Sequence, residues 1–494
     1  MRRKINRREF VRAACMGAAG IIAGQSPGGC QSTAGSRQKK PNLLFIWTDE
    51  QRADTMAAYG NTRIHAPNLN KLADESVVFQ KAYVTQPVCT PNRSAVMTGL
   101  WPHTSGCTEN NIPLPRDIRC LPELLNDPDY RTGYMGKWHL GDEIFAQHGF
   151  EKWVSIEDGY TNYYSKEHDR NKRSDYHHFL IDKGYKPDRG TKFSRAFAAR
   201  RPIEHCKPSF LEMKACEFLR RHRREPFILY INFLEPHMPF FGPLDNEHEP
   251  DDVILPANFS DPLEDNEPLC YRRKREQCIQ RYGADEKDIR SLIARYWGLV
   301  TQVDRSVGTI LRTLEALGLA ENTIVVYTSD HGDMMGSHHM VEKGVMYEEA
   351  TRIPWLIRVP QIKGKGRLIK NCVSQIDMVP TLLELLTAKS TDSLPGQSLV
   401  PLFTGGKVDQ KDVFIEWNPY SKKSLEHLYT RTIISPDGWK LCLSDVDKCQ
   451  LFNLKKDPGE TTNLFDSGRH SDIISKLRSK IYKWQREMGD KTKL

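Results

Sequence analysis

The stretch Asn42–Glu50 has the sequence NLLFIWTDE, an uninterrupted apolar run that ends in two carboxylates, Asp49 and Glu50. An apolar run of this length without alternation is typical of a strand buried on both faces of a parallel sheet. The stretch therefore predicts a central strand whose acidic residues lie at its carboxyl end.

Similar runs recur at residues 226–234, 323–328 and 353–359, and helical patterns over Asn68–Phe79 and Ile289–Leu317 lie between them. Strands that alternate with helices predict an α/β fold with a large doubly wound, mostly parallel sheet flanked by helices. Ligands bind outside the carboxyl ends of the strands in such sheets. The polar residues that follow the runs are therefore expected to share one cleft.

The pattern changes near residue 408. Short apolar runs at 413–415, 429–434, 439–441 and 450–452, followed by an amphipathic segment at 473–488, predict a smaller antiparallel sheet with one helix. We expect an export signal and linker over residues 1–36, a catalytic domain over 37–407 and a C-terminal α+β subdomain over 408–494.

The first forty residues hold nine Lys or Arg and one acid, which leaves 62 basic and 62 acidic residues in the rest of the chain. The formal charge of +8 is therefore no reason to expect a nucleic-acid partner. Arg7-Arg8 before a short apolar stretch resembles a bacterial twin-arginine export signal, which predicts a periplasmic or secreted protein. The stretch is too short to span a bilayer. Cys30 is a less favoured lipid-attachment site, because Pro27 stands where a lipobox has an aliphatic residue.

The remaining cysteines show no Cys-x-x-Cys metal pattern. Cys270 with Cys278, and Cys442 with Cys449, are close enough in sequence to form disulfides in an oxidising compartment. Buried free thiols are an equal alternative.

Carboxylates follow two of the predicted strands, Asp49-Glu50 after the first and Asp330-His331 after the third. A hard divalent ion such as calcium needs several oxygen ligands, usually from separate loops. An aspartate at a strand end is by itself more often a cap or turn residue. Two such sites on either side of Cys89 favour a metal.

The stretch Pro87–Ala95, PVCTPNRSA, places Cys89 two residues before Pro91 and four before Arg93. In this Cys-x-Pro-x-Arg pattern the chain resembles the formylglycine-dependent sulfatase family of the alkaline phosphatase superfamily. The resemblance implies that Cys89 is oxidised to formylglycine, an aldehyde, by a maturation enzyme. Twin-arginine export carries folded proteins, so this enzyme can act in the cytoplasm. We expect a helix after Pro91 that points its N–H groups at position 89, with Asn92 facing elsewhere.

The resemblance extends to both metal motifs. Thr48-Asp49-Glu50-Gln51 is similar to the first, with Glu50 where most members have Asp, and the segment from Ser329 to Asp333 is similar to the second. It implies Ca²⁺ or another divalent cation, held by the following residues: Asp49, Glu50, Cys89, Asp330 and His331.

Further segments match the family. Residues 136–141, GKWHLG, imply that Lys137 and His139 contact the sulfate and the aldehyde-derived hydroxyls, and His237 stands where the family has its leaving-group histidine. Lys343 matches a sulfate-binding lysine, and Arg93 would add positive charge. Without this resemblance, His139 would be a structural residue of a tight turn and Lys343 an exposed surface lysine.

The resemblance implies that a hydrated formylglycine attacks the sulfur of a sulfate ester while His237 or Lys343 protonates the departing alcohol, and that His139 then helps to expel sulfate. The charged and aromatic region Tyr160–Arg201 suggests a pocket wall for a carbohydrate. Two alternatives stay open: a phosphonate monoester or phosphodiester hydrolase of the same superfamily, and a non-catalytic protein that binds sulfated glycans.

Overall fold

The computed structural model describes residues 39–494 except 361, 363–365, 388, 390–393 and 419–427. The expected export signal, with Cys30, lies outside the described residues. Within the described part, no helix has both the length and the apolar character that a membrane crossing requires.

A nine-stranded mixed sheet forms the centre of the molecule, in the order β4-β3-β5-β1-β6-β8-β2-β7, with β9 paired to β2. Strands β4, β3, β5, β1 and β6 run parallel, and β8 turns antiparallel against β6. The prediction of a mostly parallel sheet is therefore confirmed. The strands are β1 (Asn42–Asp49), β2 (Val77–Tyr83), β3 (Arg131–Gly136), β4 (Lys152–Ser155), β5 (Phe227–Pro236), β6 (Thr323–Ser329), β7 (Arg352–Ile353), β8 (Trp355–Arg358) and β9 (Arg367–Ser374).

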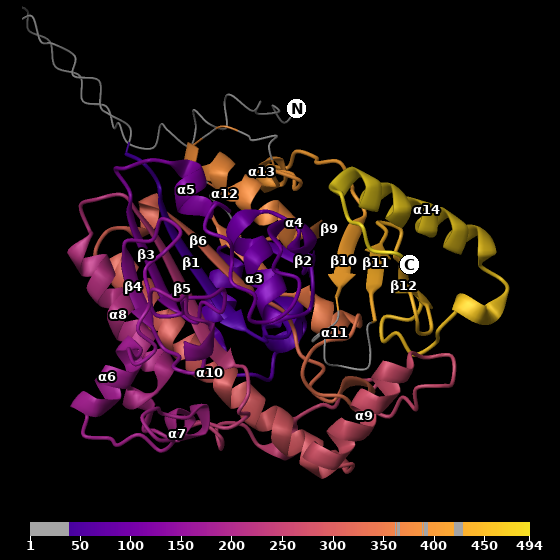
Figure 1. Ribbon diagram of the computed structural model, residues 1–494, viewed down its shortest axis with the longest axis horizontal. Coiled ribbons are helices and arrows are strands. Elements are labelled where there is room, and N and C mark those ends of the chain that lie inside the picture. Colours follow the sequence, from indigo (N-terminus) through magenta and orange to yellow (C-terminus); the bar gives the residue numbers. More distant parts are fainter. Residues whose placement is uncertain (1–38, 361, 363–365, 388, 390–393, 419–427) are drawn as a thin grey trace, which may run out of the picture.

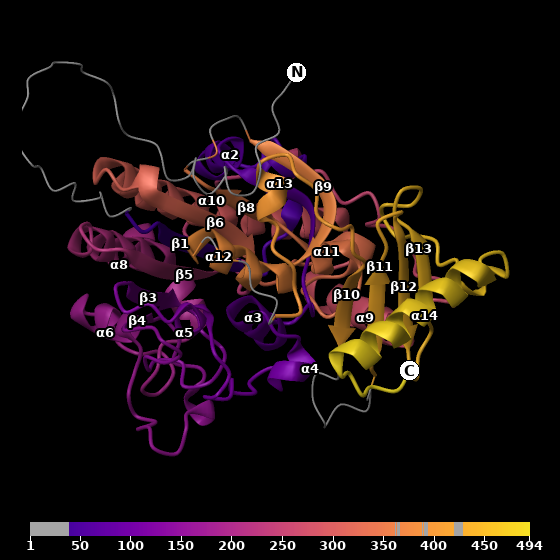
Figure 2. The same cartoon turned by 90° about the horizontal axis from the view of Figure 1, so that it is seen from above.

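Helices cover both faces of this sheet (Figure 1, Figure 2). Leu44 and Ile46 of β1 pack into a core with α2, α8 and α10, whereas Leu43, Phe45 and Trp47 pack into a second core with α3, α5, α12 and α13. Both faces of β1 are thus buried, as its unbroken apolar run predicts. The helices are α2 (Pro67–Asp74), α3 (Cys89–Thr98), α4 (Pro102–Ser105), α5 (Leu121–Leu125), α6 (Asp175–Asp182), α7 (Arg195–Ala199), α8 (Lys207–Arg221), α9 (Leu269–Tyr282), α10 (Glu286–Ala316), α11 (Glu348–Thr351), α12 (Met378–Thr387) and α13 (Val400–Phe403).

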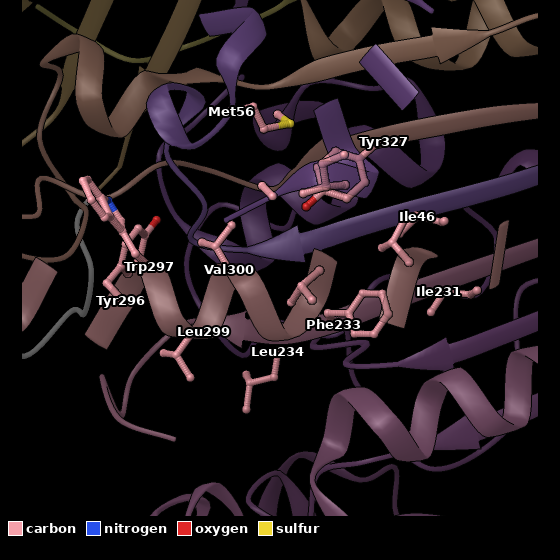
Figure 3. Close-up of a cluster of buried hydrophobic side chains, with 14 of the residues drawn as sticks. Ile46, Met56, Ile231, Phe233, Leu234, Tyr296, Trp297, Leu299, Val300 and Tyr327 are labelled. Atoms are coloured by element: carbon pink, nitrogen blue, oxygen red, sulfur yellow. The ribbon is translucent and has the colours of Figure 1, made fainter. Parts of the chain in front are cut away.

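The long helix α10 is anchored on the sheet by apolar side chains from three strands, shown in Figure 3. Each fully buried side chain of this kind contributes about 1.5–3 kcal/mol. Tyr296 of α10 adds a polar link, because its hydroxyl donates to the Glu50 carbonyl at 2.7 Å and accepts from the Arg52 N–H at 2.9 Å. The helix thereby holds the turn that follows β1.

Two predicted elements differ in the structure. The helix expected over Asn68–Phe79 ends at Asp74, and Val77 begins β2, because this β-branched and aromatic stretch pairs with β8 and β9. The strand expected over residues 353–359 is divided into β7 and β8 at Pro354, which has no N–H to donate to a ladder.

The C-terminal residues form a four-stranded antiparallel sheet in the order β10-β11-β12-β13, covered by one helix, as predicted (Figure 1). The sheet is joined to the larger one at β10, where the Glu416 N–H donates to the Thr85 carbonyl at 2.7 Å. The boundary near residue 408 stays a prediction. These elements are β10 (Val413–Trp417), β11 (Thr430–Ile434), β12 (Trp439–Ser444), β13 (Gln450–Asn453) and α14 (Ser471–Met488).

No disulfide links the cysteines of the described residues, including the two pairs considered above. Of the two alternatives, the structure of the described residues supports thiols that are not joined in disulfides.

Candidate active site

The site is built where β1 and β6 end side by side. Their parallel register pairs Thr48 with Ser329, so the residues that follow each strand emerge at the same edge of the sheet. The Glu50 N–H donates to Asp330 Oδ1 at 3.1 Å, which joins the two turns directly. Both acidic motifs therefore meet as the sequence predicts, and their carboxylates are fully buried.

Cys89 lies opposite these carboxylates, in the first turn of α3. The helix begins at Cys89 itself, so the expected start after Pro91 is three residues too late. The thiol Sγ is 3.2 Å from His331 Nε2 and 3.7 Å from Asp49 Oδ1. Burial and Asp49 alone would raise the pKa of Cys89, but the positive charges of Lys137, Lys343 and His331 bring it below its ordinary value.

Arg93 lies one turn further along α3 and is completely buried. Its Nε donates to Asp330 Oδ2 at 2.8 Å and its Nη2 to Asp49 Oδ2 at 2.9 Å, while Nη1 donates to the Lys137 carbonyl and to Asn232. All three nitrogens thus meet protein acceptors, and the expected contribution of Arg93 to the positive charge of the site stays a prediction. In the structure Arg93 fixes the two aspartates in place.

Lys137 follows β3, and its ammonium group donates a hydrogen bond to Asp49 Oδ2. The tight approach of this segment depends on Gly136, whose φ is +114° and where a Cβ would lie 1.8 Å from the Asn232 carbonyl oxygen. Burial would lower the pKa of Lys137, but Asp49 and Cys89 raise it above its ordinary value. Lys137 is therefore a fixed cation beside the thiol.

His139 is held by its backbone and its ring. Its N–H donates to Glu143 at 2.7 Å, its Nε2 lies 3.0 Å from Asn111 Oδ1, and its ring packs on Tyr160 with centroids 4.4 Å apart. Nδ1 is buried and has no hydrogen-bond partner within the described residues. Burial, reinforced by Lys137, lowers the pKa of His139 well below its usual range, so the ring is neutral.

His237 and Lys343 form the other side of the site. Lys343 Nζ donates to Glu50 Oε2 at 2.8 Å and lies 3.0 Å from His237 Nε2. His237 Nδ1 lies 2.9 Å from the Met238 carbonyl, which only accepts, so Nδ1 carries the proton and Nε2 accepts from Lys343. Burial and the ammonium group of Lys343 lower the pKa of His237 well below its usual range.

The residues fit a hard divalent cation. Ligand atoms of Asp49, Cys89, Asp330 and His331 lie within 4.8 Å of one another, and so do those of Asp49, Glu50 and His237. Glu50 Oε1 is buried without a hydrogen-bond partner in the described part of the chain. Burial raises the pKa of Glu50 well above its ordinary value, and Lys343 only partly opposes this. A carboxylate in this position gains most from a further positive charge.

Asn92 takes a supporting position that the sequence did not indicate. Its amide donates to the Asp330 carbonyl and to Gln375, and its Oδ1 accepts from the Thr85 N–H at 2.8 Å. Through the Asp330 carbonyl it holds the segment that follows β6 in place. Asn232 and Asn111 were also missed, because an isolated amide has no sequence pattern of its own.

The region Tyr160–Arg201 forms the wall of a cleft of 790 Å³ beside the site, and it contains the short helices α6 and α7. Arg195 of α7 donates through Nε to Glu157 at 2.6 Å and through Nη2 to the Tyr160 hydroxyl at 2.9 Å. Its Nη1 lies 3.4 Å from His237 Nδ1. The wall therefore contacts two histidines of the site, His139 and His237.

A mostly parallel sheet that presents a buried thiol, three carboxylates and three fixed cations at its carboxyl edge is compatible with a hydrolase that acts on anionic esters. Comparison with known proteins identifies the family of hydrolases to which the chain belongs. The sulfatase family matches residues 41–388, so the chain belongs to the sulfatase family and is a sulfuric ester hydrolase. The C-terminal family of N-sulphoglucosamine sulphohydrolase matches residues 336–487.

Individual relatives cover most of the chain. An uncharacterized sulfatase of Escherichia coli is 29% identical over 92% of this chain and 88% of its own length. An N-acetylglucosamine-6-O-sulfatase of Bacteroides thetaiotaomicron is 25% identical over 95% of this chain and 90% of its own. The crystal structure of a phosphonate monoester hydrolase of Agrobacterium radiobacter, 21% identical, has a TM-score of 0.74 and covers 91% of this chain and 96% of that one, which shows the shared fold.

Proposed function

We propose that the protein is an exported sulfatase that hydrolyses a sulfate ester on a carbohydrate through a formylglycine made from Cys89. The observation that supports this most strongly is the position of the thiol at the start of α3. It lies 3.2 Å from His331 and 3.7 Å from Asp49, and Lys137 contacts the same aspartate. A thiol that serves only for packing does not need charged groups around it. A nucleophile that attacks an anionic ester does need them.

Asp49, Glu50, Asp330 and His331, together with residue 89, would hold Ca²⁺ or another divalent cation. When bound, the cation supplies positive charge to an anionic ester and to the oxygen that attacks it. Arg93 holds the carboxyl groups of Asp49 and Asp330 in place, so these two ligands need no reorganisation. His331 is turned toward residue 89 by its Nδ1, which donates to the Gly332 carbonyl at 2.9 Å.

The hydrated aldehyde at position 89 has two hydroxyl groups on one carbon. In the first step one hydroxyl oxygen loses its proton and bonds to sulfur, the bond from sulfur to the alcohol oxygen breaks, and the alcohol leaves with a proton. The proton released by the attacking hydroxyl replaces the one that the site gives to the alcohol, so the number of protons is unchanged. Lys343 carries protons on Nζ, while His237 Nε2 is an acceptor in the structure. The geometry therefore favours Lys343 as the source of the proton, which reaches the alcohol either directly or by way of His237.

In the second step the remaining hydroxyl loses its proton, its oxygen forms the carbonyl of the aldehyde, and the bond to the sulfate oxygen breaks. His139 suits this step because burial keeps its ring neutral. Water then hydrates the aldehyde again. No water molecule attacks the sulfur of the covalent intermediate, which is why an aldehyde serves here and a serine would not.

A carbohydrate substrate is supported by the relatives and by the cleft. The relative from Bacteroides thetaiotaomicron is named for an N-acetylglucosamine-6-O-sulfate ester, and another curated relative is named an ulvan-active sulfatase. The cleft combines aromatic faces, such as Tyr160 and Phe193, with basic side chains. Aromatic faces and charged donors are suited to a sulfated sugar.

Two measurements test the proposal. The mass of the peptide that contains Cys89, taken from the native host, should show replacement of the thiol by an aldehyde, and the purified protein should release sulfate from sulfated sugars. An unmodified thiol would contradict the formylglycine. Preferential turnover of an aryl phosphate diester or a phosphonate monoester would instead support the activity named for the Agrobacterium fold relative, and tight binding without turnover would indicate a glycan-binding protein.

A further inference from the structure

We propose that Arg195 recognises a second anionic group, a carboxylate or a second sulfate, on the sugar from which the sulfate is removed. The inference rests on the function proposed above and specifies its substrate class. It follows from the free hydrogen-bonding capacity of one nitrogen, from the charge of the cleft and from the position of Arg195 beside the leaving-group histidine.

Arg195 is held rigidly by two of its three nitrogens. Glu157 accepts from Nε at 2.6 Å and the Tyr160 hydroxyl accepts from Nη2 at 2.9 Å. Glu157 is itself fixed by Lys207, which contacts its other oxygen. The guanidinium plane is thus oriented before any ligand arrives, which lowers the entropic cost of a later contact.

The third nitrogen has no acceptor of this kind. Nη1 lies 3.4 Å from His237 Nδ1, but that nitrogen carries its own proton toward the Met238 carbonyl at 2.9 Å. Two donors cannot form a hydrogen bond with each other. Within the described residues Nη1 therefore meets no carbonyl or carboxylate oxygen, and its donors remain available to a ligand.

The cleft that Arg195 lines is electropositive. Five basic residues and two acids line it. The acids are already satisfied, since Glu157 is paired with Arg195 and Lys207, and Asp158 accepts from the Ser174 N–H and lies 2.9 Å from His177. The basic residues are Arg189, Lys192, Arg195, Lys207 and Arg281. An anionic ligand thus meets more basic than acidic groups, and the oxygens of both acids already have partners.

The position of Arg195 beside His237 indicates which part of the substrate it would contact. The departing oxygen must lie near Lys343 and His237, which donate its proton in the proposed mechanism. Nη1 of Arg195 is the next donor, on the far side of the same imidazole ring. An anionic substituent close to the scissile ester, on the same or the adjacent sugar, is therefore the group that reaches it. A charge-assisted contact of this kind contributes about 1.5–3 kcal/mol.

The test compares Arg195→Ala with the parent protein on two pairs of sugars that share the scissile ester. One pair is N-acetylglucosamine-6-sulfate and glucosamine-2-N,6-O-disulfate. The other is a 2-O-sulfated hexose and a 2-O-sulfated hexuronic acid. We expect kcat/KM to fall in every case, because the substitution also releases Glu157. In the pair whose second anionic group Arg195 binds, kcat/KM for the doubly charged sugar should fall by a further ~10- to 100-fold.

The pairs distinguish a sulfate from a carboxylate, and Arg223→Ala, an exposed arginine after α8, is the matched control. Arg195→Lys should restore part of the preference, since it keeps the charge but not the planar donor pair. Equal loss for both members of both pairs, accompanied by a shifted pH profile of kcat/KM, would show that Arg195 only positions His237 and would overturn the inference.

Binding to the Cys89→Ala protein, measured by calorimetry with the same sugars, separates this inference from the proposed function. A preference for the doubly charged sugar that disappears on adding Arg195→Ala supports the role of Arg195 even if no turnover is found. Absence of the preference in both pairs overturns it, whether or not the parent protein is a sulfatase.

Discussion

The floor of the site and the wall of the cleft are built in different ways. The floor is made by strand ends and by the first turns of α3, and Asp49, Arg93 and Asp330 are fully inaccessible there. The wall is made by a segment with only short helices, in which Arg195 is held through side chains by Tyr160 and by Glu157, which precedes the segment. Regular structure thus positions the groups proposed for chemistry, and side-chain pairs position those proposed for selectivity. Changes in the floor should abolish turnover, and changes in the wall should alter which substrate is turned over.

The largest expected effect is that of Cys89→Ala. Removal of the nucleophile should lower kcat by at least about 1,000-fold on every substrate, because no other group reaches the same position. Sulfate release is the measurement, and Cys372→Ala, outside the site, is the matched control. Retained activity would show that the nucleophile is a different residue.

Removal of divalent cations should be nearly as severe. Chelation and dialysis should lower turnover by about 100-fold or more, since the carboxylates then repel an anionic ester, and Ca²⁺ or another divalent ion should restore it. The thermal midpoint should also fall, because the ion stabilises only the folded state. Turnover unchanged in exhaustively chelated protein would contradict the metal role of Asp49 and Asp330.

Arg93→Ala tests whether the floor is also a structural unit. The substitution leaves Asp49 and Asp330 buried without one of their cations, so the free energy of unfolding should fall by about 3–5 kcal/mol. Arg431→Ala offers the comparison, because it breaks a similarly buried pair with Asp490 in the C-terminal sheet. Both should lose stability in urea denaturation, but only Arg93→Ala should lose turnover under conditions where both remain folded.

The wall should respond to acid. Burial would raise the pKa of Glu157, but Arg195 and Lys207 lower it to about 2. Because the folded pKa lies below the unfolded value, the stabilisation is complete above about pH 5 and is lost as the pH falls toward 2. The free energy of unfolding of the parent protein should therefore decline more steeply over that interval than that of Glu157→Gln. Identical slopes would show that the pair is not coupled to folding, and Glu217→Gln, on the exposed side of α8, serves as the control.

Tyr160→Phe should have the smallest effect. It removes the hydroxyl that accepts from Arg195 but keeps the ring that packs on His139. A hydrogen bond from a charged donor contributes about 1.5–3 kcal/mol, but Glu157 still holds the guanidinium group, so kcat/KM for a doubly charged sugar should fall by less than about 10-fold. A larger loss, or an equal loss for singly and doubly charged sugars, would place Tyr160 in the chemistry of His139 and not in the wall.

The same contrast explains what could be predicted from the sequence. The floor was readable because strand ends and helix starts follow from apolar runs and from the spacing of Cys89, Pro91 and Arg93. Parallel pairing then brings distant motifs together without any further information. The contacts of Arg93 could not be read, because which of several neighbouring acids an arginine meets depends on side-chain geometry.

The sequence indicated where the wall of the cleft lies, but not which of its residues contact the site. The aromatic and charged composition of Tyr160–Arg201 indicated a pocket, yet nothing in it singled out Arg195 from the other basic residues. Its role depends on Glu157, which comes before the segment, and on the proton position of His237, which depends on the Met238 carbonyl. Such relations arise only from tertiary packing.

The burial of Cys89 has a consequence for the order of events in the life of the protein. Cys89 is 1% exposed, and its thiol lies 3.2 Å from His331 and 3.7 Å from Asp49, which are both fully buried. No enzyme active site can close around a thiol in that position. If Cys89 is converted as proposed, the conversion must be finished before the first turn of α3 docks on β1, while the chain is still being made or has just left the ribosome. Folding then seals the aldehyde inside, and export of an already folded chain would carry a finished enzyme across the membrane.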